Sequence, residues 1–242
     1  MAEGSVGMIF STNGSTAHHP YYPLDAVVPG YVANSISTPA LIASFAAGCT
    51  VILSSACRLV QKKNPSLPRG EVAAALWFIL CGFIHFFFEG YFAYNFHRTG
   101  SRTDLFGQLW KEYSLSDSRY MTQDAFIVCM ETITAVFWGP LSFVCAYAIV
   151  VDHPVRYSLQ SIVSLGQLYG DVLYYATNQY ERAMTELVFC RPEGVYFWAY
   201  YVMMNAFWIV IPLLLVIQST RQTARLASKL KEVERATRKK NR

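Results

Sequence analysis

Three titratable side chains, His85, Glu89 and Glu131, lie inside long apolar runs of the sequence. His85 and Glu89 are four residues apart, so they share one face of a helix. Ionisable groups inside a bilayer are costly, and they normally face the interior of a helix bundle and take part in function. One imidazole and two carboxyl groups in an apolar setting can donate and accept protons. The pattern therefore favours proton transfer on an apolar substrate.

Further polar residues occur at matching depths in the same runs and in others. Thr134 comes three residues after Glu131, and Asn205 comes three residues before Trp208, so each pair shares a helical face. At about 1.5 Å per residue, these groups fall in one slab of a hydrocarbon core about 30 Å thick. One shared pocket explains this coincidence more economically than separate accidents.

The run near residues 156–178 carries a polar stripe. Gln160, Gln167, Asp171 and Tyr174 are spaced by seven, four and three residues, which is one face of a helix. A lone Asn, Gln or Thr inside a membrane is more often an interhelical hydrogen bond than a functional group. That interpretation stays open for Thr134, Gln160 and Gln167. Gln167, Asp171 and Tyr174 are expected either to bind substrate or to support the residues that do the chemistry.

The sequence lacks the residues and motifs that other kinds of catalysis normally use. Of five His, only His85 falls at membrane depth, so no metal site is expected. No Walker loop, dinucleotide fingerprint or nucleophile elbow is present, and no cofactor is expected. The six Cys show no CxxC spacing and are expected to be unpaired, buried small residues.

Five apolar segments must position these side chains. They lie near 39–60, 72–96, 124–151, 156–178 and 195–217, and a spanning helix needs about 20 residues. The fourth is the weakest of them because of its polar stripe. The chain is 53% hydrophobic and 15% charged, whereas soluble domains carry about 25% charged residues. The predicted fold is therefore all-α, a polytopic membrane bundle with five transmembrane helices.

The chain divides into three predicted parts. Residues 1–38 form an N-terminal arm rich in Ser, Gly and Pro, 39–217 form the helical domain, and 218–242 form a basic tail. The arm has no basic n-region before an apolar stretch, so no cleaved signal peptide is expected. Residues 97–123 are interpreted as a loop of mixed charge between the second and third segments.

Basic residues predict the orientation in the membrane. Arg58, Lys62, Lys63 and Arg69 lie in the first connection, Lys and Arg crowd the tail, and the arm has neither. The positive-inside rule therefore predicts a cytoplasmic tail and a lumenal arm. Residues 239–242 match a dilysine pattern, which indicates the endoplasmic reticulum membrane. Membrane lipid headgroups suit such a tail better than nucleic acid, which is not expected as a partner.

Ordered blocks of sequence strengthen this interpretation. They are CGFIH with EG at 81–90, LWKEY with DSRY at 109–120, VCMETITA with WGP at 128–140, GQLYGDVLY at 166–174 and MNAFW at 204–208. In this order they resemble the emopamil-binding protein family with its EXPERA domain, the Δ8–Δ7 sterol isomerases. The resemblance implies sterol isomerase activity in sterol biosynthesis. It also implies a set of catalytic positions: His85, Glu89, Glu131, Thr134, Asn205 and Trp208.

The implied reaction adds a proton at sterol carbon 9, leaves a cation at carbon 8 and removes a proton from carbon 7. The pair His85 and Glu89 is expected to donate the first proton. Glu131 is expected to accept the second, with Thr134 orienting it. The reverse assignment of acid and base stays open.

The resemblance also implies the partners. Trp208 is expected to lie against the cation, with Asn205 holding Trp208 or a neighbouring carboxyl. The substrate is then a Δ8 sterol, lipophilic amines are inhibitors, and a homodimer stays open. The alternatives are a non-catalytic membrane protein that binds sterols or amines in the same pocket, and a lipid carrier or scaffold.

Overall fold

A computed structural model describes residues 18–241 of the chain, and the described part is helical without strands. Residues 1–17 of the predicted arm and Arg242 of the dilysine pattern lie outside the described residues. In chain order the helices, with η marking π and 3₁₀ turns, are α1 (Thr38–Lys63), α2 (Arg69–Phe83), η1 (Ile84–Glu89), α3 (Gly90–Asn95), η2 (Phe96–Ser101), α4 (Leu105–Tyr113), η3 (Ser118–Tyr120), α5 (Ala125–Ile133), η4 (Thr134–Trp138), α6 (Gly139–Val150), α7 (Arg156–Thr185), η5 (Tyr196–Met204) and α8 (Asn205–Lys240).

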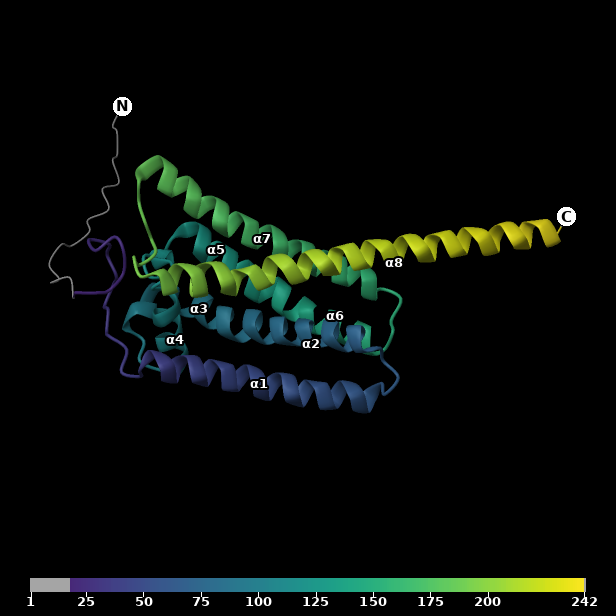
Figure 1. Cartoon of the computed structure of the whole chain (residues 1–242), viewed down its shortest axis with the longest axis horizontal. Coiled ribbons are helices and arrows are strands. Elements are labelled where there is room, and N and C mark those ends of the chain that lie inside the picture. Colours follow the sequence, from purple (N-terminus) through teal and green to yellow (C-terminus); the bar gives the residue numbers. More distant parts are fainter. Residues whose placement is uncertain (1–17, 242) are drawn as a thin grey trace, which may run out of the picture.

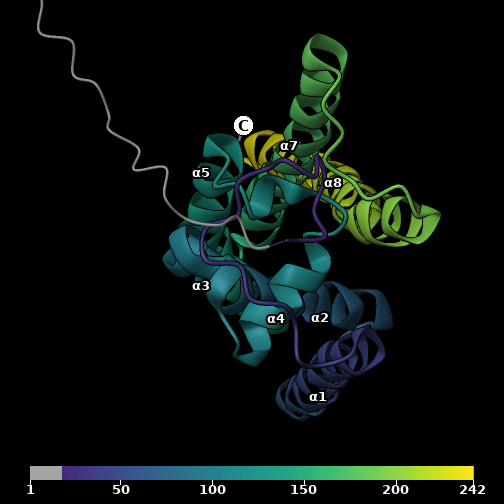
Figure 2. The ribbon, with the colours of Figure 1, turned by 90° about the vertical axis from the view of Figure 1, so that its left-hand side faces the viewer.

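The long helices run side by side in an elongated bundle (Figure 1). Helix α1 packs on α2, α2 packs on α6, and α7 packs along α8. Seen from the end that carries α4, α1 lies at one edge of the bundle and α7 rises at the opposite edge (Figure 2). This arrangement confirms the predicted all-α helical bundle.

Four helical stretches of the described chain are long and apolar enough to cross a membrane: Thr38–Lys63, Arg69–Ser101, Ala125–Val150 and Tyr196–Lys240. Large apolar side chains such as Val51 and Leu59 on α1 are 65% and 67% exposed, as expected of a surface that faces lipid. The chain is a multi-pass membrane protein. Helix α7 is 30 residues long and carries the polar stripe, and its role as a fifth span remains a prediction.

Three of the long helices contain π-helical turns at the level of the predicted site. η1 holds His85 and Glu89, η4 begins at Thr134, and η5 leads into α8 at Asn205. A π turn inserts one extra residue per turn, and such turns are frequent at functional sites. The facing turns η1 and η4 are in contact, so they bring the second and third spans together at the site.

Gly139 permits the close approach of the two π turns. A Cβ atom at Gly139 would lie 2.9 Å from the backbone nitrogen of Phe86. We expect Gly139→Ala to destabilise the folded protein by about 1–3 kcal/mol because the clash is with backbone that cannot rotate away. Gly48→Ala in α1 is the matched control, since no atom of residues 18–241 lies within 4 Å of its Cβ position.

Thermal unfolding in detergent measures both variants. Gly48→Ala is expected to be neutral or slightly stabilising because Ala favours a helix by about 0.5–1 kcal/mol. Equal midpoints for Gly139→Ala and wild type would contradict the close approach of η1 and η4.

Residues 97–123 are not a plain loop, so that interpretation was wrong. They contain η2, α4 and η3, and α4 lies across one end of the bundle (Figure 2). Asp104 begins α4 by accepting a hydrogen bond from the Gly107 backbone nitrogen, 3.1 Å away. The helix is amphipathic and short, and its inner face closes the end of the bundle.

The described part of the arm, residues 18–37, is non-helical, as its Pro residues predict. It packs against α4 and holds this helix in place. Tyr21 is 1% exposed and donates to the Lys111 carbonyl over 3.0 Å. Gln108 receives the backbone N–H groups of Ser35 and Ile36, each at 2.9 Å. The arm and α4 therefore form one cap over this end of the bundle.

A buried arginine, paired with an aspartate of the cap, joins the cap to α7. Arg119 in η3 is 1% exposed and lies 2.7 Å from the Asp117 carboxylate. The same guanidinium donates to the Thr177 hydroxyl at 2.9 Å and the Tyr174 carbonyl at 3.2 Å. An unpaired charge at this depth would be very costly, so the pair fixes the position of the next residue, Tyr120.

Helix α8 continues without a break through the predicted boundary at residues 217 and 218, and its C-terminal part projects beyond the bundle (Figure 1). It leaves the bundle at the end where α1 joins α2, so the basic connection and the basic tail lie at the same end. Gln160 of α7 donates to the Leu215 carbonyl of α8 over 3.2 Å, which confirms the interhelical interpretation of Gln160.

Candidate functional site

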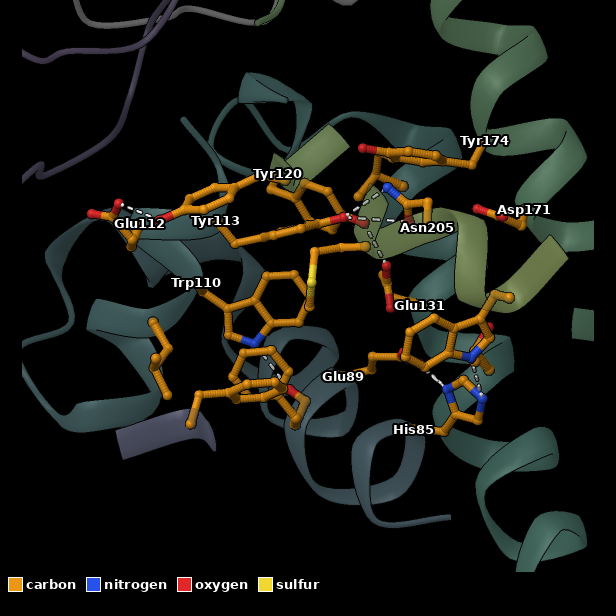
Figure 3. A pocket seen from close by; sticks show the side chains of 18 of the residues that line it. His85, Glu89, Trp110, Glu112, Tyr113, Tyr120, Glu131, Asp171, Tyr174 and Asn205 are labelled. Carbon is orange, nitrogen blue, oxygen red and sulfur yellow. Dashed lines mark hydrogen bonds and ion pairs between the residues drawn. The ribbon is translucent and has the colours of Figure 1, made fainter. Parts of the chain in front are cut away.

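An apolar cavity of about 590 Å³ lies between the α4 cap and the π turns. Its volume falls within the range of about 300–1,000 Å³ that is common for small-molecule sites. The predicted site residues all line it: His85, Glu89, Glu131, Thr134, Gln167, Asp171, Tyr174, Asn205 and Trp208. Four long helices therefore contribute polar groups to one cavity, and Figure 3 shows these side chains converging.

His85 and Glu89 form a hydrogen-bonded pair in η1. The Nδ1 atom of His85 lies 2.8 Å from one carboxylate oxygen of Glu89 and 2.9 Å from the other. His85 is 2% exposed. The Glu89 side chain is 14% exposed, so little water competes for this contact, which strengthens the interaction between the two groups.

The other ring nitrogen of His85 has two neighbours. The Gln167 side-chain nitrogen lies 2.9 Å from Nε2, and the Trp208 indole nitrogen lies 3.4 Å from it. An indole N–H can only donate, so in this arrangement Nε2 accepts and the ring proton lies on Nδ1, facing Glu89. Gln167 and Trp208 therefore hold the imidazole in the tautomer that connects it to the carboxylate.

Glu131 has a different partner from the predicted one. The hydroxyl group of Tyr120 donates to Glu131 Oε1 over 2.9 Å, whereas the Thr134 hydroxyl donates to the Met130 carbonyl over 2.8 Å. Burial, and next the nearby Glu131 carboxyl, raise the pKa of Tyr120 well above its ordinary value, so its hydroxyl stays protonated as a donor. The expectation that Thr134 orients Glu131 was wrong, and Tyr120 takes that position.

Asn205 also departs from its expected contacts. Its side-chain nitrogen lies 3.2 Å from the Tyr113 hydroxyl and 2.7 Å from the Tyr201 carbonyl. The expectation that Asn205 holds Trp208 or a carboxyl was wrong in this structure. Asn205 instead ties α8 to the cap through Tyr113 of α4.

Three residues of the α7 stripe that line the cavity each have a polar atom with no hydrogen-bond partner among the described residues. These atoms are Oε1 of Gln167, Oδ2 of Asp171 and the hydroxyl of Tyr174, all buried. Unsatisfied buried polar atoms are costly, so a polar ligand or water in the cavity would stabilise them. This side of the cavity therefore offers polar contacts in addition to the groups around His85.

An aromatic wall and a second polar group complete the cavity, both supplied largely by the cap. Trp110 stacks on Phe88 with ring centroids 4.7 Å apart and an interplanar angle of 11°. Glu112 faces the cavity as well, near the end drawn farthest from His85 in Figure 3. The sequence reading missed Trp110, Glu112, Tyr113 and Tyr120 as site residues. The dense aromatic residues of 105–120 were the signal that could have revealed them.

Comparison with known proteins agrees with this geometry. Residues 105–219 match the family model described as EXPERA, the expanded EBP superfamily. The mouse 3-beta-hydroxysteroid-Delta(8),Delta(7)-isomerase is 40% identical over 217 residues, covering 87% of this chain and 90% of the mouse protein. The rat protein of the same name is 40% identical over 223 residues, covering 88% and 91%. A probable enzyme of that name from Arabidopsis thaliana is 32% identical over 226 residues, covering 93% and 98%. This chain belongs to the EXPERA family.

Proposed function

We propose that this protein is a sterol isomerase that shifts the ring double bond of a Δ8 sterol to the Δ7 position. The relatives that cover most of the chain carry this activity in their names. The observation that carries the proposal is the presence of two hydrogen-bonded pairs of proton-handling groups in one apolar cavity. His85 with Glu89 forms one pair, and Glu131 with Tyr120 forms the other.

The reaction needs one proton donor and one proton acceptor and no oxidant. The donor gives a proton to carbon 9, the π electrons of the double bond form the new C–H bond, and carbon 8 becomes a tertiary cation. Loss of the proton at carbon 7 returns an electron pair between carbons 7 and 8. The proton count is unchanged overall, so a cavity with two carboxyl groups suffices.

The two pairs differ in a way that suits these roles. The His85 ring proton faces Glu89, so the pair can hold a proton between two basic sites and pass it to the substrate. Glu131 accepts a hydrogen bond from the neutral hydroxyl of Tyr120, and its carboxylate has further lone pairs that can take the proton from carbon 7. In this proposal His85 and Glu89 donate, and Glu131 accepts.

Trp208 has two functions in the proposal. Its N–H group lies against His85, and its ring lines the cavity. The face of an indole ring attracts a cation by about 2 kcal/mol or more where water is excluded. Trp208 would therefore stabilise the cation at carbon 8 and fix the His85 tautomer as well.

Expression in a host that lacks its own Δ8–Δ7 isomerase tests the proposed function in membranes. We expect Δ8 sterols to fall and Δ7 sterols to rise when this chain is expressed. A membrane-inserted chain that binds Δ8 sterol and leaves the Δ7 pool unchanged would favour the non-catalytic sterol binder instead.

The proposal includes the location and the division of the chain. The basic α1–α2 connection and the tail lie at one end of the bundle, which supports a cytoplasmic tail and a lumenal cap. The dilysine pattern supports residence in the endoplasmic reticulum. Within this scheme 1–38 is the lumenal arm, 39–217 the isomerase domain and 218–242 the cytoplasmic tail.

Protease digestion of sealed microsomes tests this orientation. We expect external protease to remove an epitope placed after Arg242, because the C-terminal part of α8 is exposed and projects beyond the bundle. An epitope in the arm should be degraded only after detergent opens the vesicles. Protection of the tail epitope in intact vesicles would overturn the orientation.

A further inference from the structure

Glu112 lies at a second polar end of the cavity that the proton-transfer groups do not use. It lies on α4, lines the cavity and is 7% exposed. We propose that Glu112 accepts a hydrogen bond from the 3β-hydroxyl group of the sterol and thereby fixes which ring carbons face Glu131 and His85. The inference rests on the proposed function, because it requires a hydroxysterol in the cavity.

The surroundings of Glu112 suit a hydroxyl ligand. The Thr38 hydroxyl donates to Oε2 over 3.0 Å, and the Tyr200 hydroxyl donates to Oε1 over 3.1 Å. These two contacts come from the start of α1 and from η5, so three elements hold the carboxylate in place. An ionised carboxylate has about four acceptor positions, which leaves room for another donor. A carboxylate facing an apolar cavity gains stability from each donor it receives.

The residues that contact Glu112 and His85 are separated along the η5–α8 helix by about the length that a sterol needs. Tyr200 contacts Glu112 and Trp208 contacts His85, and these two residues are eight positions apart on η5 and α8, at most about 12 Å along the axis. With C–C bonds of about 1.5 Å, the hydroxyl oxygen of a sterol lies about 6 Å from carbons 7 to 9. A hydrogen bond of about 3 Å from the sterol hydroxyl to Glu112 and an approach of about 3 Å between the ring carbons and the proton-transfer groups bring the total to about 12 Å.

Asp171 is the competing anchor, since it lines the cavity and its buried Oδ2 atom has no partner in the part of the chain that the structure describes. It lies only four positions from Gln167, the residue that contacts His85, which is about 6 Å along α7. The total of about 12 Å for the hydrogen bond, the sterol rings and the approach to His85 does not fit in this separation. The geometry therefore favours Glu112.

The location of Glu112 also matches the way a sterol lies in a bilayer. The α4 cap joins two spans, so its end of the cavity is the end nearer the membrane–water interface. A membrane sterol keeps its hydroxyl at this interface and its rings in the hydrocarbon. Ile42 of α1 lines the cavity and is 49% exposed, so the cavity wall beside it faces lipid. A sterol entering there would already hold its hydroxyl at the level of Glu112.

The test compares two Δ8 substrates that differ only at carbon 3, one with a hydroxyl and one with a ketone. A carboxylate can only accept, so wild type should prefer the hydroxyl in kcat/KM by about 10- to 100-fold. The amide of Glu112→Gln can also donate, so this variant should accept the ketone and narrow the preference by about tenfold or more. A damaged cavity would lower kcat/KM for the hydroxysterol and for the ketone together, so the preference between them would not shift towards the ketone.

Matched variants separate the possible outcomes. Glu234→Gln in the exposed tail should keep the wild-type preference, and Asp171→Asn should keep it too. If Glu112→Gln does not insert, Glu112→Asp should selectively weaken turnover of the hydroxysterol because its carboxylate is withdrawn by one methylene. An unchanged preference in the Glu112 variants, or a shift in Asp171→Asn, overturns this inference alone. Failure of wild type to convert either sterol overturns the proposed function together with it.

Discussion

Replacing Glu131 with Gln is expected to lower the turnover of a Δ8 sterol by about 10²–10⁴-fold, the usual contribution of a general acid or base. Gln keeps the size of the side chain and can still accept the Tyr120 hydrogen bond of 2.9 Å, so the fold should survive. An amide cannot take up the proton from carbon 7. His85→Ala should show a loss of the same order because it removes the proton held against Glu89. Single-turnover conversion, followed by separation of Δ8 and Δ7 sterols, measures both effects.

Tyr120→Phe and Glu234→Gln are the controls for this experiment. Tyr120→Phe leaves Glu131 in place and removes one hydrogen bond, so a smaller loss of about tenfold is expected. Glu234→Gln repeats the same chemical change in the exposed tail and should have no effect. Turnover near the wild-type rate in Glu131→Gln or His85→Ala would remove that residue from the mechanism.

Lipophilic tertiary amines are expected to bind about 10²-fold or more tightly than the substrate, because a protonated amine imitates the cation at carbon 8. The cavity offers the carboxyl groups of Glu89 and Glu131 and the ring of Trp208. A neutral carbon analogue of the same shape lacks the charge and should bind far more weakly. Inhibition constants for matched amine and carbon pairs give the difference directly. Equal potency of the pair would contradict a cation in this cavity.

Trp208→Leu extends this prediction. We expect amine affinity and turnover to fall together by about 30-fold, because a cation–π contact of about 2 kcal/mol would serve both. Trp198→Leu is the matched control, since Trp198 lies in η5 and is 68% exposed. A Trp208→Leu protein that loses turnover and still binds amines normally would show that Trp208 acts through His85 rather than on the cation.

The sequence predicted the long helices and the depth of the site because both depend on local pattern. Apolar runs gave the spans, and the spacing of His85 and Glu89 gave their shared face. The structure has these residues in a π turn, and they still meet at 2.8 Å. The prediction that these residues line one cavity rested on their similar depth in the membrane.

The partners within the site could not be predicted in the same way. Hydrogen bonds between Tyr120 and Glu131, or between Tyr113 and Asn205, join residues whose separation depends on how η3 and α4 fold over the bundle. Helix α4 is only nine residues long and carries polar groups, so its apolar periodicity is short. The ion pair of Asp117 and Arg119 that fixes η3 has no local signature either, because its other contacts come from α7.

The conversion of a Δ8 sterol by the purified protein tests the central claim most directly. The protein in detergent or nanodiscs is incubated with a Δ8 3β-hydroxysterol, without nicotinamide, flavin or metal, and the sterols are separated by gas chromatography and mass spectrometry. The account predicts a Δ7 product of unchanged mass from wild type and almost none from Glu131→Gln. Sterol binding by wild type with no Δ7 product would contradict it.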